Sequence, residues 1–245
     1  MSQKQTSGFM ETVMTVIYAV LIALVIRTVA YEPFNIPSGS MKPTLLVGDY
    51  LFVSKFSYGY SRHSLPFSLP LIPGRILFSE PQRGDVAVFK LPSNPKVDYI
   101  KRVIGLPGDR IQVVQGLLHI NGQPVRREPA GIYVLHDDTT GATRPVNRYI
   151  ETLPNGKQHP IIEADGDFGP ADNTRVFVVP KDHYFMMGDN RDNSTDSRFA
   201  HVGFVPKENF VGRAEFLFFS VEGSAWEIWK WFDTVRVGRL FTGIE

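Results

Sequence analysis

The feature that most constrains the fold is a long apolar segment near the start of the chain. Residues 12–26, TVMTVIYAVLIALVI, carry no charge, and residues 9–31 contain only two charged side chains, Glu11 and Arg27. A helix over these 23 residues measures about 34 Å, enough to cross the hydrocarbon core of a bilayer. Glu11 and Arg27 lie toward opposite ends, where each reaches an interface, Arg27 by snorkelling. The sequence therefore predicts one transmembrane helix over residues 9–31.

A cleaved signal peptide is the alternative for the same segment. Residues 28–30, TVA, place small side chains where a cleavage site needs them. Three charges favour an uncleaved anchor instead. Glu11 lies near the start of the run, Arg27 lies just before the possible cleavage site, and Lys4 is the one basic residue ahead of the run. Charge does not settle the orientation, because Lys4 favours a cytoplasmic N-terminus whereas Arg27 lies on the wrong side for the positive-inside rule.

The rest of the chain reads as short strands and turns. Short runs rich in Val and Phe predict strands at residues 48–56 and 84–91. Two more strands, joined by a turn at 105–109, are expected over 97–114. Asn121-Gly122 and Asn155-Gly156 each indicate the turn of a hairpin. Residues 116–182 are polar and interrupted by Gly and Pro. We expect a mostly β protein in which residues 1–8 form an N-terminal tail, 32–115 and 183–245 a core, and 116–182 an inserted β subdomain.

Composition excludes several classes of function. Lys+Arg 26 against Asp+Glu 25 gives a net charge of +1, so no overall field favours nucleic acid. The absence of cysteine excludes disulfides, thiolate metal sites and a cysteine nucleophile. Residues 64–78 and the tryptophan-rich segment 225–232, AWEIWKWF, are more apolar than loops require; they fit either a core edge with a packed C-terminal helix or a face on the bilayer interface.

Two kinds of site are considered and not favoured. Asp192, Ser194 and Asp196 in GDNRDNSTDSR imitate the start of a calcium loop, but Ser197 replaces the required Gly and Gly203 the closing Glu, so we expect no metal. A Ser-His-Asp triad is the second kind. His183 precedes Asp189 by six residues, but nothing in the spacing joins the six histidines to a serine.

A serine with a lysine base is the third kind of site. In the predicted strand VDYIKRVIG, alternation places Lys101 on one face with apolar neighbours, while Arg102 shares the other face with Asp98 as its expected partner. Burial without a counter-charge lowers the pKa of a lysine, which allows it to act as a base at neutral pH. Lys101 is therefore a candidate catalytic base, and the turn PSGSMKPT at residues 37–44 offers candidate serines.

Four segments together resemble, in order and spacing, the motif boxes of bacterial type I signal peptidases, also called leader peptidases. They are FNIPSGSMKPTLLVGD (34–49), RGDVAVFK (83–90), DYIKRVIGLPGD (98–109) and GDNRDNSTDSR (188–198). The resemblance extends from the apolar segment to about Ala214. It implies an antiparallel β core, of the kind that self-cleaving repressors share, and a membrane-bound serine endopeptidase without a cofactor.

The resemblance also implies roles for individual residues. Ser40 would be the nucleophile, Lys101 the general base, and Ser38 the hydroxyl that stabilises the oxyanion beside the backbone N–H of Ser40. In the last box Ser194 would orient Lys101, with Asp196 and Arg198 as a supporting ion pair. Pockets for small substrate side chains would be lined by Phe34, Ile36, Pro37, Met41, Leu45, Val88, Tyr99 and Ile100.

The implied substrates are preproteins whose signal peptides end in small-x-small, commonly Ala-x-Ala, bound as a strand beside the DYIKR segment. The implied location is the inner membrane, with the N-terminus in the cytoplasm, the catalytic domain on the outer face, the bilayer as a partner and the secretion translocon as a conceivable neighbour. One departure is that the best-known Gram-negative members have two spans. Alternatives are an inactive membrane-anchored β domain and a self-cleaving regulator, although the latter needs a DNA-binding unit where the apolar segment stands.

Overall fold

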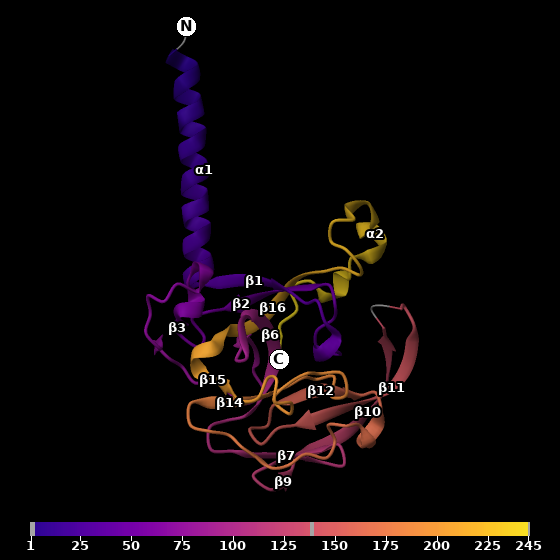
Figure 1. The fold of residues 1–245 in the computed structure, drawn as a ribbon. Coiled ribbons are helices and arrows are strands. Elements are labelled where there is room, and N and C mark those ends of the chain that lie inside the picture. Colours follow the sequence, from indigo (N-terminus) through magenta and orange to yellow (C-terminus); the bar gives the residue numbers. More distant parts are fainter. Residues whose placement is uncertain (1–2, 138–139, 245) are drawn as a thin grey trace.

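The computed structural model describes residues 3–137 and 140–244, without the side chains of residues 3–7 and 67. The start of the predicted N-terminal tail (1–2), two residues of the predicted insertion (138–139) and the last residue of the predicted core (245) lie outside the described residues. Helix α1, Gln3–Val29, projects away from a β-rich body (Figure 1).

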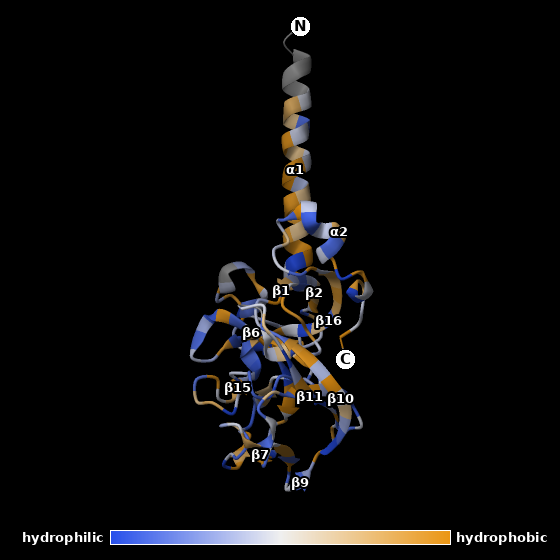
Figure 2. Cartoon of the chain, turned by 90° about the vertical axis from the view of Figure 1, so that its right-hand side faces the viewer, coloured by the Kyte–Doolittle hydropathy of each residue, from blue (hydrophilic) through white to orange (hydrophobic). Residues whose placement is uncertain are grey.

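Within the described chain, α1 is the one helix long and apolar enough to cross a membrane, over Gly8–Val29. Over residues 8–29 its side chains are exposed on all sides, with Phe9 at 72% and Ile22 at 60%, and Figure 2 shows this part apolar along most of its length. The hydroxyls of Thr12 and Thr15 donate to carbonyls four residues earlier, at 2.9 Å each, so they need no water. An all-round apolar helix of this length fits a lipid environment better than a protein core.

The largest sheet has seven strands and is antiparallel throughout. Its order is β1 (Tyr31–Asn35), β2 (Asp49–Ser54), β16 (Phe210–Ser220), β5 (Val86–Leu91), β6 (Asn94–Gly105), β14 (His183–Met187) and β15 (Val205–Pro206). The expected mostly β fold with an antiparallel core is confirmed.

Smaller sheets complete the body. A three-stranded sheet contains β10 (Arg126–His136), β11 (Thr143–Thr152) and β12 (Gln158–Glu163); a four-stranded one contains β13 (Phe177–Val178), β7 (Arg110–Val114), β8 (Leu117–Ile120) and β9 (Gln123–Pro124); and β3 (Tyr60–Ser61) pairs with β4 (Arg75–Ile76). Asn121 and Gly122 both have positive φ, 56° and 80°, as the turn between β8 and β9 requires. β7 pairs with strands of the 116–182 range, and the division into core and insertion stays a prediction.

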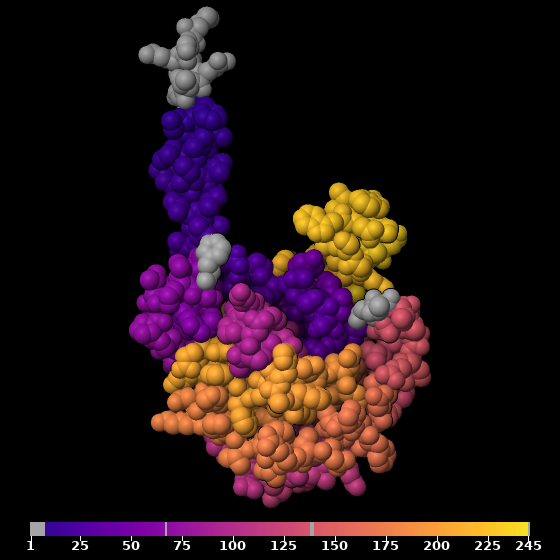
Figure 3. Space-filling model, in the orientation of Figure 1, coloured from indigo at the N-terminus to yellow at the C-terminus, as the bar shows by residue number. Residues whose placement is uncertain are grey.

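Short helices occupy several connections. They are η1 (Gly39–Met41), η2 (Arg62–Ser64), η3 (Pro66–Ser68), η4 (Gly166–Phe168), η5 (Lys207–Asn209), η6 (Ile228–Lys230), α2 (Trp231–Thr234) and η7 (Val237–Arg239). The tryptophan-rich segment around α2 projects from the same side of the body as α1 (Figures 1 and 3). Trp231 packs on Phe219 with ring centroids 5.1 Å apart, but Trp226 and Phe232 are 88% and 99% exposed. This segment is therefore only partly packed on the core.

Candidate active site

The centre of the site is a contact between two side chains that lie 61 residues apart in the sequence. Lys101 Nζ on β6 lies 2.6 Å from Ser40 Oγ on η1, and the two residues are 4% and 8% exposed. The ammonium also donates to the carbonyl of Ile100, at 3.0 Å. The structure thus brings together the predicted nucleophile and the predicted base.

Strand β6 sets the direction of Lys101. It pairs with β5, placing Lys101 opposite Ala87 and Arg102 opposite Val86, and the alternation sends the two basic side chains to opposite faces. Arg102 binds Asp189 through two hydrogen bonds, at 2.9 and 2.8 Å. Asp98, the partner expected for Arg102, instead accepts from Lys90 at 2.9 Å. That sequence prediction was wrong because residues four apart on a strand lie about 13 Å apart.

The turn that carries Ser40 is held by the loop after β14. The backbone N–H of Asn190 donates to the Ser40 carbonyl at 3.1 Å, and Asn190 Nδ2 donates to the Gly39 carbonyl at 3.1 Å. Thr44 Oγ1 donates to Asp189 at 2.6 Å. The same loop therefore fixes both the serine turn and, through Asp189 and Arg102, the strand that carries Lys101.

The environment of Lys101 favours the neutral amine. Burial lowers the pKa of Lys101 from 10.5 to about 8, although the nearby carboxylates of Asp196 and Asp189 oppose the shift. When the ammonium loses a proton, the direction of the 2.6 Å hydrogen bond reverses. The Ser40 hydroxyl then donates to the lone pair of the Lys101 amine. The pair can therefore transfer the hydroxyl proton to the amine.

The other residues of the last motif box lie close by. Asp196 and Arg198 form a buried ion pair with two hydrogen bonds of 2.9 Å, and the Arg198 guanidinium lowers the pKa of Asp196 against the effect of burial. Ser194 is 7% exposed, and its Oγ has no hydrogen-bond partner among the described residues. The expected hydrogen bond from Ser194 to Lys101 is thus not formed in this structure, and its orienting role stays a prediction.

Gly188 is a residue of the site that sequence reasoning did not single out. A Cβ at this position would lie 2.2 Å from Ser194 Oγ and 2.5 Å from the Ser40 carbonyl oxygen. Its backbone N–H donates to Asp196 at 3.0 Å. Only glycine lets the serine turn and the Ser194 side chain approach the end of β14 so closely. The glycine that opens GDNRDNSTDSR was the available signal.

A cleft of about 420 Å³ opens beside the Ser40 and Lys101 pair. Of the predicted pocket residues, Pro37, Tyr99 and Ile100 line it. Ile36, Met41, Leu45 and Val88 are buried in an apolar cluster, against which Phe34 and Ile100 pack. Five further lining residues were not predicted: Gly39, Val97, Asp98, Asn193 and Thr195.

One edge of β6 faces this cleft without a strand partner. Across the described residues, β14 pairs with β6 only at Arg102, Val103 and Gly105, whereas β5 accompanies the opposite edge from Asn94 to Arg102. The stretch of β6 that includes Tyr99 and Lys101 therefore offers free backbone groups beside Ser40. Such an edge can accept an extended peptide as an additional strand.

The histidine alternative fails because no histidine in the described part of the chain joins Asp189 to a serine. His159 is the buried histidine beside Asp189, with Nδ1 3.4 Å from Asp189 Oδ1, but neither of its ring nitrogens has a hydrogen-bond partner among the described residues. His183 Nδ1 contacts the carbonyl of Lys181 at 2.8 Å on the surface, while Asp189 is buried against Arg102. A buried serine and lysine lie in contact at the open edge of an antiparallel sheet, in a chain with an apolar N-terminal helix. This arrangement fits a serine peptidase.

Comparisons with known proteins identify the family. The model of the family "Signal peptidase, peptidase S26" matches residues 9–219. The chain is 42% identical to a signal peptidase I of Rickettsia typhi over 93% of its length and 90% of the relative, and equally identical to that of Rickettsia canadensis over the same shares. A crystal structure of a signal peptidase I from Enterococcus faecalis is 26% identical, covering 55% of this chain and 97% of the other, with a TM-score of 0.31. The chain belongs to the signal peptidase family S26 and is a serine peptidase that removes signal peptides.

Proposed function

We propose that the chain cleaves exported preproteins after a small-x-small site, with Ser40 as nucleophile and Lys101 as general base. The observation that carries the proposal is the 2.6 Å contact between these two buried groups at the floor of a cleft. Neutral Lys101 takes the hydroxyl proton as Ser40 Oγ attacks the scissile carbonyl, and the protonated lysine then gives it to the leaving amine. Water hydrolyses the acyl-enzyme by the same route, and no cofactor enters.

Ser38 is positioned to stabilise the oxyanion. Its side chain does not cap the η1 helix that follows it, and its Oγ lies 3.4 Å from Ser40 Oγ. A hydroxyl at this place can rotate to donate to an oxygen that becomes charged when Ser40 attacks, together with the backbone N–H of Ser40. The ion pair of Asp196 and Arg198 supports Lys101 from the loop after β14. Ser194, in the same loop, orients Lys101.

The substrate binds as a strand along the free edge of β6. Its side chains then alternate, and those on one side enter the cleft at Pro37, Tyr99 and Ile100. Beneath this surface the core is closed, since Met41 and Leu45 are completely buried. Only small side chains fit against such a floor, which accounts for Ala at the first and third positions before the scissile bond.

We expect this specificity to appear in an assay of the purified full-length protein in detergent. A preprotein with Ala at the first and third positions before the cleavage site is processed, and Ala→Phe at either position lowers kcat/KM about 100-fold or more because the ring meets a closed floor. Phe at the second position, whose side chain points away from the cleft, is the matched control. Equal processing of all four substrates contradicts the proposed binding mode.

The pH dependence of cleavage follows from the base. Because Lys101 acts as the neutral amine and its pKa is about 8, its active fraction is about 1% at pH 6 and about 10% at pH 7. The kcat/KM for a preprotein should therefore rise about tenfold per pH unit below pH 8 and level off above it. Initial rates at low substrate concentration between pH 5.5 and 9.5 measure this profile. A flat profile over that range excludes Lys101 as the base.

We also propose that α1 anchors the protein in the inner membrane with the N-terminus in the cytoplasm and the body on the outer face. The free end of α1 points away from the body, and the tryptophan-rich segment projects on the same side (Figures 1 and 3). Trp226, Trp229 and Phe232 are at least 71% exposed there. Aromatic side chains of this kind favour the bilayer interface, so this side of the body would face the lipid. Proximity to the translocon follows only from the shared substrate.

A further inference from the structure

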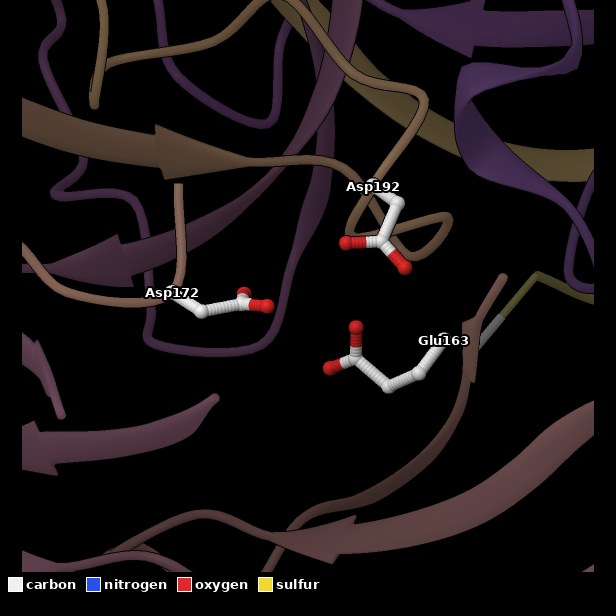
Figure 4. Close-up of side chains that lie close together, drawn as sticks. All are labelled: Glu163, Asp172 and Asp192. Carbon is white, nitrogen blue, oxygen red and sulfur yellow. The ribbon is translucent and has the colours of Figure 1, made fainter. Parts of the chain in front are cut away.

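Three carboxylates meet outside the cleft, where the three-stranded sheet approaches the loop after β14. Glu163 ends β12, Asp172 follows η4, and Asp192 belongs to that loop (Figure 4). One oxygen of each lies within 4.8 Å of the others. Glu163 and Asp172 are 1% exposed and Asp192 is half-buried. Three anionic groups this close strongly disfavour a common ionised state unless a cation or a proton joins them.

The guanidinium groups around the cluster are each committed to a carboxylate outside it. The three pairs, each with two hydrogen bonds, are Arg127 with Asp167, Arg191 with Glu151, and Arg198 with Asp196. Arg127 Nη1 lies 3.7 Å from Glu163 Oε1, which is too long for a hydrogen bond. These three pairs are internally balanced, so the cluster keeps its own negative charge.

The hydrogen bonding of the three side chains independently indicates a missing partner. Neither carboxylate oxygen of Glu163 has a hydrogen-bond donor among the described residues, and neither does Asp192 Oδ1. The remaining contacts hold the cluster in place, because Gly169 N–H donates to Asp172 at 2.6 Å and Asp165 N–H donates to Asp192 at 2.7 Å. Figure 4 shows the Glu163 carboxylate directed toward the space that the other two carboxylates face. A buried carboxylate without any donor is unfavourable.

The donor set selects a hard cation, since it consists of carboxylate oxygens only. Ca²⁺ binds oxygen at about 2.3–2.6 Å, so two of its ligands lie at most about 4.6–5.2 Å apart. A mutual spacing within 4.8 Å is therefore in the range that the ligands of one Ca²⁺ span. The backbone leaves room for this approach only at a glycine, because a Cβ on Gly169 would lie 2.7 Å from Asp192 Oδ1.

We propose that Glu163, Asp172 and Asp192 form a Ca²⁺ site that fastens the segment 163–172 to the loop carrying Ser194 and Asp196. The site differs from the single-loop calcium motif considered for the sequence, because its ligands come from three separate segments and share only Asp192 with that motif. It is also independent of the proposed catalytic mechanism, since none of its ligands contacts Ser40 or Lys101 in the hydrogen bonds of the described residues.

A proton on Glu163 is the competing way to balance the cluster. Burial raises the pKa of Glu163 to about 9, so without a cation this carboxyl is neutral at pH 7. Glu163→Gln has nearly the shape and charge of the protonated acid, so it should fold without Ca²⁺ as well as the parent protein does. The variant therefore separates the two explanations, because a glutamine amide cannot supply the charge that the cation needs.

The test is the melting temperature of the full-length protein in detergent at pH 7, followed by tryptophan fluorescence in EGTA and in CaCl₂ at constant ionic strength. When free Ca²⁺ exceeds Kd about 100-fold, the melting temperature of the parent protein should rise by about 5–10 °C. Glu163→Gln should lose this rise. Asp165→Asn is the matched control, because it removes an exposed carboxylate two residues away and should keep the rise.

Asp192→Asn gives a second reading if Glu163→Gln fails to fold, because this half-buried position tolerates an amide more easily. It too should lose the response to Ca²⁺. Equilibrium dialysis with ⁴⁵Ca²⁺ should show one ion per parent chain and none in either variant. A melting temperature that Ca²⁺ leaves unchanged in the parent protein, or raises equally in the parent and in Glu163→Gln, overturns the proposal.

Discussion

Ser40→Ala should reduce kcat/KM for a preprotein about 10⁴-fold or more, to the limit of detection in a gel-based processing assay. The substitution removes one oxygen from a side chain that is 8% exposed, so the fold should persist. What is lost is the atom proposed to attack the carbonyl, and losses of this size follow removal of a nucleophile whose partner groups cannot act without it.

The control for Ser40→Ala is His183→Ala, which alters a half-buried side chain that the triad hypothesis would require. We expect His183→Ala to retain the activity of the parent protein. Circular dichroism and melting temperature should show both variants folded. Full processing by Ser40→Ala would contradict the assignment of Ser40, and loss of activity in His183→Ala would favour a histidine base instead.

Lys101→Met should be as inactive as Ser40→Ala, with kcat/KM lowered about 10³-fold to 10⁵-fold. Methionine keeps the length and the apolar stem of lysine but cannot accept the hydroxyl proton. Unlike activity, stability should not fall. Lys101 is 4% exposed, and its pKa drops from 10.5 to about 8 on folding, which corresponds to about 3 kcal/mol of unfavourable burial at neutral pH.

The sign of this effect can be checked with pH. Because the pKa of folded Lys101 lies below that of the unfolded chain, the unfolded state binds more protons between pH about 8 and about 10.5, and stability attributable to this group increases across that window. Below pH 8 the cost is complete. Thermal melts at pH 7 should therefore find Lys101→Met at least as stable as the parent protein. An inactive variant that is also strongly destabilised would point to a structural role for Lys101.

The strands and turns of this chain could be predicted because their signals are local. Asn121-Gly122 supplies the two positive φ angles of a tight hairpin, and the alternation around Lys101 placed it and Arg102 on opposite faces of one strand. The pairing of Ser40 with Lys101 was expected only from the resemblance of four motif boxes. Residue spacing alone says nothing about a contact across 61 positions.

Other features depended on how distant segments pack. Asp189 replaced Asp98 as the partner of Arg102 because the loop after β14 folds back over β6, which no local pattern reveals. The closeness of Glu163, Asp172 and Asp192 has the same origin, since the three belong to different segments. Gly188 illustrates a third limit: its importance comes from the Ser194 side chain and the Ser40 carbonyl oxygen, which would collide with a Cβ, and the sequence shows only a glycine in a loop.

The joint between α1 and the sheet has a consequence for how substrates are chosen. β1 begins at Tyr31, two residues after α1 ends. Glu32 fixes the junction, because its carboxylate accepts a hydrogen bond from Arg27 and forms an ion pair with Lys55, at 2.9 Å each. The Tyr60 hydroxyl also donates to the Val29 carbonyl, at 2.8 Å. A flexible tether would let Ser40 sample many heights above the bilayer. With α1 in the bilayer as proposed, a stiff joint would hold Ser40 at a single height. The peptide bond that is cut would then be the one that a signal peptide, embedded in the same bilayer, brings to that height.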